Sequence, residues 1–287
     1  MKVKVFLVDA FCLNGEGGNP AGVVLDAESL DKEQMQAIAS QVGFSETAFV
    51  SIDAKQSLTV RYFTPVSEVM FCGHATLAAF FTLYSERRIE PGTYQFSTQA
   101  DCLSVDISEK GDILVSYPAP KFLGQLPVEE IAPLFNLNPV DLDVDSLPIN
   151  IISVGANDVI VPVSSGMLDT VEPNLDAINA YCQSHDVLAF HLFEFSIDDD
   201  QHTIHGRNFA PLVGINEECA TGTANGALAC YLAREVPSLG PHYRFSQGRA
   251  MGRESLIHVN LTFDDDRIDT VKVGGQARFS GLRTLRA

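Results

Sequence analysis

The hydrophobic and polar positions of the chain form short patterns that are typical of strands and of buried helices. Residues 1–5 alternate polar and apolar side chains, which predicts a strand. Residues 60–63 are β-rich and end before Pro65, whereas residues 75–84 (ATLAAFFTLY) have the composition and length of a buried helix. Residues 224–232 (ANGALACYL) predict a second buried helix, which Gly226 weakens locally. Strands and helices together predict an α+β protein.

These patterns occur twice, in the same order. Arg61 and Phe63 precede Cys72 in the first half, as Arg207 and Phe209 precede Cys219 in the second. The segment YQFSTQ at 94–99 matches YRFSQ at 243–247, and alternating stretches follow at 103–107 and 256–261. Three matches in one order predict a duplication. We expect two similar domains facing each other: residues 1–118, joined by the C-terminal strand 275–287, and residues 119–274.

The charge of the chain excludes several classes of function. It carries 37 acidic and 19 basic side chains, a formal net charge of −18, so we expect no nucleic-acid surface. No apolar run approaches the roughly 20 residues of a membrane helix, and the alternating start lacks the apolar run of a signal peptide. Six cysteines without C-x-x-C spacing predict neither a disulfide framework nor a structural zinc site. We therefore expect a cytoplasmic protein.

Small residues precede both predicted helices. A helix N-terminus presents N–H groups without partners and a partial positive charge, and small side chains let a ligand approach them. Two such ends would hold an anion, most simply the carboxylate of a small substrate between the two domains. The predicted contacts are Gly73, Ala75 and Thr76 in the first half and Thr221, Gly222 and Thr223 in the second.

Glu46 is the first candidate for chemistry. It precedes an apolar, β-rich run, so we expect it at a strand entrance among hydrophobic neighbours. Such surroundings raise the pKa of a carboxyl group, which suits a general acid/base near neutral pH. His74 is positioned to assist by donating to a substrate or passing on a proton.

Cys72 and Cys219 hold matching positions in the repeated motif. Beside helix N-termini their thiol pKa values would be lowered. Facing each other, they could remove a proton from one face of a carbon and return one to the other face, as in a cofactor-independent racemase. No second histidine at motif spacing accompanies Cys72 and His74, so we expect no metal.

The glycine-rich segment at 15–22 fits neither a P-loop nor a dinucleotide fingerprint, so no nucleotide cofactor is expected. Asn19 within it is a candidate ligand contact. The acidic runs at 198–200 and 264–266 are predicted to be solvated hairpin tips.

The same residues resemble the PhzF-like family, named for a phenazine-biosynthesis isomerase. The similarity extends in order over almost the whole chain. In the first half it rests on residues 8–11, 18–22, 45–49, 61–65 with 68–69, and 72–76; in the second, on 207–211, 214–215, 220–222, 247–248 and 251–253.

The resemblance implies the diaminopimelate epimerase-like fold, in which two pseudo-symmetric domains each wrap a mostly antiparallel sheet around a central helix. It also implies isomerisation by proton transfer without a cofactor, and a homodimer. In the phenazine enzyme the residues matching Glu46, His74, Glu218 and Thr223 line the site, with the glutamate moving the proton.

This sequence departs from the family pattern at its second motif. The phenazine-type motif EDPATGS reads EECATGT at 217–223, with Cys219 in place of proline. Cys72 and Cys219 fall where diaminopimelate epimerase has its two catalytic cysteines, so the phenazine substrate is not expected.

Three hypotheses follow. The first is a cofactor-independent isomerase in which Glu46 moves a proton on a small carboxylate. The second is a racemase or epimerase that uses Cys72 and Cys219. The third is a non-catalytic small-molecule binder. The sequence does not identify the substrate.

Overall fold

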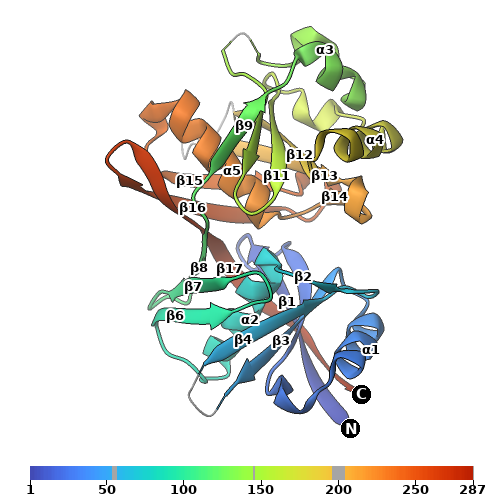
Figure 1. Ribbon diagram of the computed structural model, residues 1–287, viewed down its shortest axis with the longest axis vertical. Coiled ribbons are helices and arrows are strands. Elements are labelled where there is room, and N and C mark those ends of the chain that lie inside the picture. The colour runs from blue at the N-terminus through green and yellow to red at the C-terminus, as the bar shows by residue number, and fades with distance from the viewer. Residues whose placement is uncertain (54–56, 145, 196–203, 287) are drawn as a thin grey trace. The chain divides into compact units, whose positions relative to one another are not determined.

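The computed structural model describes residues 1–53, 57–144, 146–195 and 204–286 (Figure 1). The chain folds into two compact units. Unit 1 comprises Met1–Ser116 and Gly274–Ala287, and unit 2 comprises Tyr117–Val273. The acidic run at 198–200 lies outside the described residues, whereas the exposed run at 264–266 forms the turn of a hairpin, as predicted.

Unit 1 contains the α-helices α1 and α2 and the strands β1 to β8. Its helices are α1 (Lys32–Val42) and α2 (Gly73–Ser85). Its strands are β1 (Lys2–Cys12), β2 (Asn19–Val24), β3 (Glu46–Ile52), β4 (Leu58–Phe63), β5 (Glu68–Val69), β6 (Gly92–Ser97), β7 (Cys102–Ile107) and β8 (Ile113–Tyr117), whose last residue begins unit 2.

Unit 2 contains the remaining α-helices and strands. Its helices are α3 (Val128–Ile131), α4 (Leu175–His185) and α5 (Gly222–Glu235). Its strands are β9 (Lys121–Gln125), β10 (Asn150–Ser153), β11 (Asn157–Pro162), β12 (Ala189–Phe195), β13 (Ile204–Ala210), β14 (Ile215–Glu218), β15 (His242–Gln247), β16 (Ser255–Asp264) and the first part of β17 (Arg267–Arg286). Short 3-10 turns are η1 (Ala27–Ser29), η2 (Ala132–Phe135), η3 (Pro139–Asp141), η4 (Leu168–Thr170), η5 (Pro211–Val213), η6 (Pro237–Leu239) and η7 (Arg249–Met251).

Both units pair their strands in the same pattern. In unit 1, β1 is antiparallel to β2, β2 parallel to β3, and β3 antiparallel to β4; β4 is antiparallel to β5 and parallel to β6, which is antiparallel to β7. In unit 2, β10 to β16 repeat every one of these pairings in the same order. Each unit also has a helix between its second and third strands and another after its fifth. The duplication inferred from sequence is therefore present in the topology.

The two predicted buried helices are α2 and α5. Nine of the 13 residues of α2 are buried, and ten of the 14 residues of α5. A helix that is buried on nearly all sides must be surrounded by its own sheet, because an amphipathic helix buries only one stripe. This confirms the α+β class with a central helix in each unit (Figure 1).

The helices α1 and α4 each pack on a separate apolar core, one in each unit. On α1, Met35, Ile38 and Val42 pack with residues of β1, β2 and β3, and Asp31 and Gln34 form a capping box at its N-terminus. In unit 2, Ile178 and Cys182 of α4 pack against Val159 of β11, in a cluster that includes residues of β12 and β13. The opposite faces of these strands are therefore left for α2 and α5.

An ion pair is repeated with the strands. Arg61 bonds Glu68 through two contacts of 2.7 and 3.0 Å, and Arg207 bonds Glu217 through two of 2.8 and 2.9 Å. Each pair links the fourth strand of its unit to the short fifth strand, which leads into the central helix. The pairs therefore fix where α2 and α5 begin.

None of the helices in the described part of the chain is long and apolar enough to span a membrane. The glycine-rich segment predicted to be unrelated to nucleotide binding forms the tight turn between β1 and β2, where Gly15, Gly17 and Gly18 have positive φ angles.

Candidate functional site

A polar cluster lies in unit 1 where three elements begin. Glu46 is the first residue of β3, as predicted, and Asn19 is the first residue of the parallel neighbour β2. Cys72 is the N-cap of α2, and His74 lies in its first turn. Because both strands start at the edge where α2 begins, four residues that sequence analysis singled out come together.

His74 is the centre of this cluster. Its Nε2 lies 3.2 Å from Oε2 of Glu46 and 3.4 Å from Oγ of Ser45. Its Nδ1 lies 3.3 Å from the Asn19 side-chain amide and 3.4 Å from Sγ of Cys72. The His74 side chain is 5% exposed and that of Glu46 13%. The carboxylate is therefore the member of the pair that a ligand can reach.

The cluster favours a charged pair. Burial by itself would raise the pKa of the Glu46 carboxyl, but the hydrogen bond and charge of His74 outweigh it and lower that pKa. Burial likewise opposes charging of His74, yet Cys72 and Glu46 hold the pKa of His74 well above its ordinary value. Both shifts favour the form of the pair in which Glu46 is a carboxylate and His74 an imidazolium.

Two expectations about acidity were wrong. Glu46 was expected to have a raised pKa because its neighbours in the sequence are apolar, but its spatial neighbour is a histidine from a distant element. The Cys72 pKa was expected to be lowered by the helix N-terminus. Instead burial, followed by the charge of Glu46, raises the pKa of the Cys72 thiol.

Three donor atoms of this cluster could hold a metal ion. Those of Glu46, Cys72 and His74 lie within 4.8 Å of one another. A metal requires a thiolate and a neutral imidazole, however, and the pKa shifts of Cys72 and His74 favour the opposite protonation states. The positions of the three donor atoms would therefore allow a metal ion to bind, but the protonation states that Cys72 and His74 favour oppose it.

The first turn of α2 matches the predicted anion-binding site only in part, because some of its polar groups already have partners in the protein. The N–H and hydroxyl of Thr76 both donate to the Cys72 carbonyl, at 3.0 and 2.6 Å, and its hydroxyl also contacts that of Tyr62. Thr76 is fully buried, and its expected contact with a substrate stays a prediction. Gly73 and Ala75 lie in the first turn, where N–H groups have no carbonyl partner within the helix.

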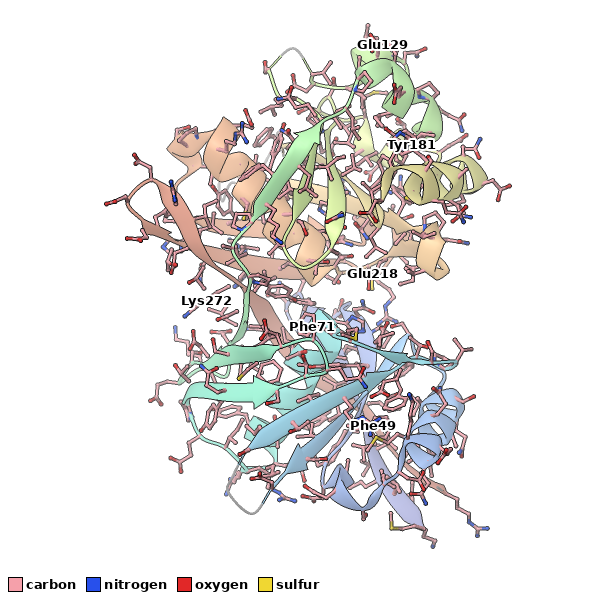
Figure 2. The ribbon with its side chains drawn as sticks, viewed as in Figure 1. Phe49, Phe71, Glu129, Tyr181, Glu218 and Lys272 are labelled. Carbon is pink, nitrogen blue, oxygen red and sulfur yellow. The ribbon has the colours of Figure 1, made fainter. Side chains whose placement is uncertain are left out.

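A second polar cluster surrounds the start of α5 in unit 2. The Thr221 hydroxyl donates to Oε2 of Glu218 at 2.5 Å, and the Thr221 N–H donates to Oε1 of Gln247 at 3.1 Å. Gln247 also donates to the Glu218 carbonyl, and Asn225 donates to Oε1 of Gln247. Figure 2 labels Glu218 at the end of β14. Because the N–H of Thr221 is occupied, Gly222 and Thr223 remain as the predicted ligand contacts of this turn.

Cys219 does not occupy the position that corresponds to Cys72. The N-cap of α2 is Cys72, the fourth residue after the ion-paired Glu68; the N-cap of α5 is Thr221, the fourth residue after the ion-paired Glu217. Cys219 lies two residues before that cap. Cys72 and Cys219 follow their arginines at similar distances, 11 and 12 residues, and this suggested a matched pair of thiols. In unit 2, however, η5 lengthens the connection, so the residue at the start of α5 lies further from Arg207.

Sequence reasoning missed three residues of these clusters. Ser45 lay inside the recognised 45–49 motif, and Gln247 belonged to the repeated strand motif, yet neither was assigned a role. Asn225 follows Thr223 within the predicted helix, where it had been counted only as part of an apolar run. Strand pairing, which brings Gln247 to α5, supplies the information that the sequence lacked.

Unit 2 also contains a hollow beside the connection between β10 and β11. It has a volume of about 410 Å³ and is lined by Asn157, Leu188, Leu212 and the last turns of α4. None of the predicted site residues lines it.

Comparisons with known proteins identify the family. Residues 8–280 match the family described as phenazine biosynthesis-like protein. The chain is 33% identical over 289 residues to an uncharacterized isomerase of Clostridium acetobutylicum, covering 96% of this chain and 95% of that one. It is 34% identical to the uncharacterized isomerase YddE of Escherichia coli K12, covering 96% of each.

Solved structures agree. The crystal structure of a PhzF-family phenazine biosynthesis protein of Bacillus anthracis matches with a TM-score of 0.89 and 31% identity, covering 100% of both chains. A hydroxyproline epimerase of Agrobacterium vitis shares the fold alone, with a TM-score of 0.63 and 11% identity, covering 99% of this chain and 92% of that one. The chain therefore belongs to the phenazine biosynthesis-like family, PhzC-PhzF, and is an isomerase of that family.

Proposed function

We propose that the protein is a cofactor-independent isomerase in which Glu46 moves a proton on a small carboxylate substrate. The observation that carries this proposal is the contact of 3.2 Å between the Glu46 carboxylate and the buried His74 imidazole. A carboxylate with 13% of its side chain exposed can accept a proton from a ligand. His74, nearly closed to solvent, then holds and orients it.

The proton transfer balances within the substrate. A C–H bond next to a conjugated or carbonyl-bearing carbon breaks, its proton goes to the Glu46 carboxylate, and the electron pair spreads into the substrate. The proton then returns from Glu46 to another carbon of the same system. No electron leaves the substrate, so the product is an isomer.

The first turn of α2 supplies the binding part of the proposal. Gly73 and Ala75 are small residues on either side of His74, which contacts Glu46, and the partial positive charge of a helix N-terminus favours a carboxylate. In unit 2, Gly222 and Thr223 begin α5 in the same way. Whether one substrate contacts both units, and whether the protein is a homodimer, stay predictions from the sequence.

Replacing Glu46 tests the assignment. The variant Glu46→Gln keeps the shape and removes the base, so we expect proton exchange to fall by roughly 10²- to 10⁴-fold. Amino acids and unsaturated ring carboxylates would be incubated in D₂O with each variant and followed by proton NMR. Glu129→Gln, an exposed glutamate on α3 labelled in Figure 2, is the matched control. Near-normal exchange in a folded Glu46→Gln protein would contradict the proposal.

The same assay separates the alternatives. The contact of Cys72 with His74 favours a thiol route as the second candidate, with Cys219 as the expected second thiol. That route predicts loss of exchange at an amino-acid α carbon in Cys72→Ser and Cys219→Ser, and inactivation by alkylation. A non-catalytic binder would show a ligand-induced rise in melting temperature with no exchange in any variant.

A further inference from the structure

A row of polar side chains crosses the sheet of unit 2 beneath α5. His191 on β12 is the register partner of Asn208 on β13, which in turn is the partner of Glu218 on β14. Ile160 on β11 is the partner of His191, and Asp158 lies two residues before Ile160. Register partners, and residues two apart on one strand, share a face of the sheet.

This face is the one toward α5. The alternate residues Val159 and Phe190 belong to the apolar core with α4, so Asp158 and His191 point away from it. Phe193, two residues after His191, packs its ring against Tyr231 of α5 at 5.6 Å between centroids. We call Asp158, His191, Asn208 and Glu218 the polar row.

The corresponding positions of unit 1 are mostly apolar. There the register partners are Val23, Ala48, Tyr62 and Val69, and Ala21 corresponds to Asp158. The Tyr62 hydroxyl has a partner, Thr76, at 2.7 Å. The two units thus share one arrangement of strands. The acidic and imidazole side chains of the polar row occur only in unit 2.

The fold makes room for the row at a cost in stability. A Cβ on Gly206 of β13 would lie 2.9 Å from Nε2 of His191, whereas the residue of unit 1 that corresponds to Gly206 is Val60. Both carboxyl oxygens of Asp158, Nε2 of His191 and Oδ1 of Asn225 have no hydrogen-bond partner among the described residues. All three side chains are at most 1% exposed. Burying a polar group without a hydrogen-bond partner destabilises the fold, so apolar residues like those of unit 1 would be more stable here.

Burial also determines which groups of the row are charged. Burial, followed by the charge of Glu218, raises the pKa of Asp158 well above its ordinary value. Burial lowers the pKa of His191 to about 4 and outweighs its hydrogen bond with Asn208, so His191 is neutral. Glu218 accepts the Thr221 hydroxyl in a contact of 2.5 Å, as expected for a carboxylate.

We propose that the polar row holds a proton behind the unit 2 site: Asp158 remains a neutral acid at neutral pH, and Glu218 carries the only negative charge of the row. Asp158 is then a positioning residue. Its ionisation would place a second negative charge behind the first turn of α5 and weaken the binding of an anionic substrate there. The inference about binding rests on the proposed function; the inference about the proton does not.

The titratable groups that face Asp158 are few. Among the described residues, β14 contributes Glu218 and β12 the neutral His191. On α4, burial and the charge of Asp158 raise the pKa of the Cys182 thiol to about 11. The helix α5, which packs on this face, carries Cys230, and burial raises the pKa of that thiol to about 12. No cation among these groups would stabilise an ionised Asp158.

Carboxyl carbon NMR on the folded protein, without substrate, tests the proton. Aspartate and glutamate side chains would be labelled with ¹³C and titrated from about pH 5 to pH 10, a range that spans the ordinary histidine and thiol values. We expect Asp158 to show the shift of a protonated acid at pH 7 and Glu218 that of a carboxylate. Asp158→Asn assigns the signal, with the exposed Asp186→Asn as control. If Asp158→Asn does not fold, through-bond correlation from residue 158 assigns it in the wild type.

Glu218 provides a second measurement. Because a neutral Asp158 and an asparagine carry the same charge, Asp158→Asn should leave the Glu218 titration unchanged below neutral pH. An ionised Asp158 signal at pH 7, or a clear fall in the pKa of Glu218 in Asp158→Asn, would overturn the proposal.

Kinetics test the consequence for binding. The wild-type KM should rise in the alkaline range as Asp158 ionises, with kcat changing less, and Asp158→Asn should remove that rise while staying within about threefold of wild type at pH 7. An alkaline rise in KM that persists in Asp158→Asn would overturn the binding role. If no substrate is turned over, the NMR result still decides where the proton is, so failure of the two proposals is distinguishable.

Discussion

At the scale of single residues, Glu46 shows how far a sequence neighbourhood can mislead. The apolar run after it predicts its place at the start of β3 correctly, but not its electrostatics. A charge-assisted contact with His74, 28 positions away in the chain, outweighs the burial that the run implies. Cys72 differs for the converse reason: burial and a nearby carboxylate outweigh the favourable end of α2.

The ion pair of Glu46 and His74 predicts a pH-dependent stability. Because the folded pKa of His74 is raised above its ordinary 6.5, its stabilisation is complete below that value and is lost as the pH rises through the folded pKa. The folded pKa of Glu46 is lowered, so its contribution is present above its ordinary 4.5 and lost as the pH falls through the folded value.

Urea unfolding across pH measures this. The stability difference between wild type and His74→Gln should be largest at or below about pH 6, in the range above the folded Glu46 pKa, and should shrink in the alkaline range. A difference that is constant with pH would mean that His74 acts only through packing. Exposed His185→Gln on α4 is the control.

At the scale of elements, the repeat was visible in sequence because strand and helix patterns survive duplication. The extents of α2 and α5 follow from runs of small and apolar residues that no single amphipathic face could bury. The alignment between the copies was less secure. The insertion of η5 before β14 shifted Cys219 against Cys72, and only the repeated ion pairs show that Thr221 is the true counterpart.

These ion pairs predict different losses of stability in the two units. Arg207 has a side chain 9% exposed and also donates to the Leu168 and Val171 carbonyls, whereas Arg61 is 29% exposed. We expect Arg207→Met to lower the free energy of unfolding by about 3 kcal/mol, since it leaves a partly buried Glu217 unpaired. Arg61→Met should cost about 1 kcal/mol, because Glu68 keeps its ion pair with Lys32 at 3.2 Å. Chemical denaturation of both variants compares them; equal losses would contradict this ranking.

At the scale of the whole molecule, β17 belongs to both units. Its residues up to Val273 lie in unit 2, and from Gly274 it pairs with β1 over nearly the whole length of that strand. The last residues of the chain are thus built into the same sheet as the first. A sequence pattern shows that such a strand exists, but its partner lies near the other end of the chain, as in the pair of Lys2 and Arg286.

Removing Gly274–Ala287 should therefore unfold unit 1. Without this strand, β1 keeps β2 on one side but loses β17 on the other, so the backbone N–H and C=O groups that bond to β17 are left without partners. Hydrogen exchange should show lost protection in β1, β2 and β3, whereas a chain ending at Leu285 should retain it. Protection of β1 in the shorter chain would show that unit 1 folds without β17.

The sequence by itself determined the α+β class, the duplication, the two central helices and the gathering of Glu46, His74, Cys72 and Asn19 among the candidates. It could do so because apolar periodicity and small residues before a helix are local properties of the chain. The tertiary structure decided which groups are charged, that Thr221 rather than Cys219 caps α5, and that Asp158, His191 and Glu218 share one face of a sheet. These depend on strand register and on burial, which place residues far apart in sequence within a few ångströms and out of water.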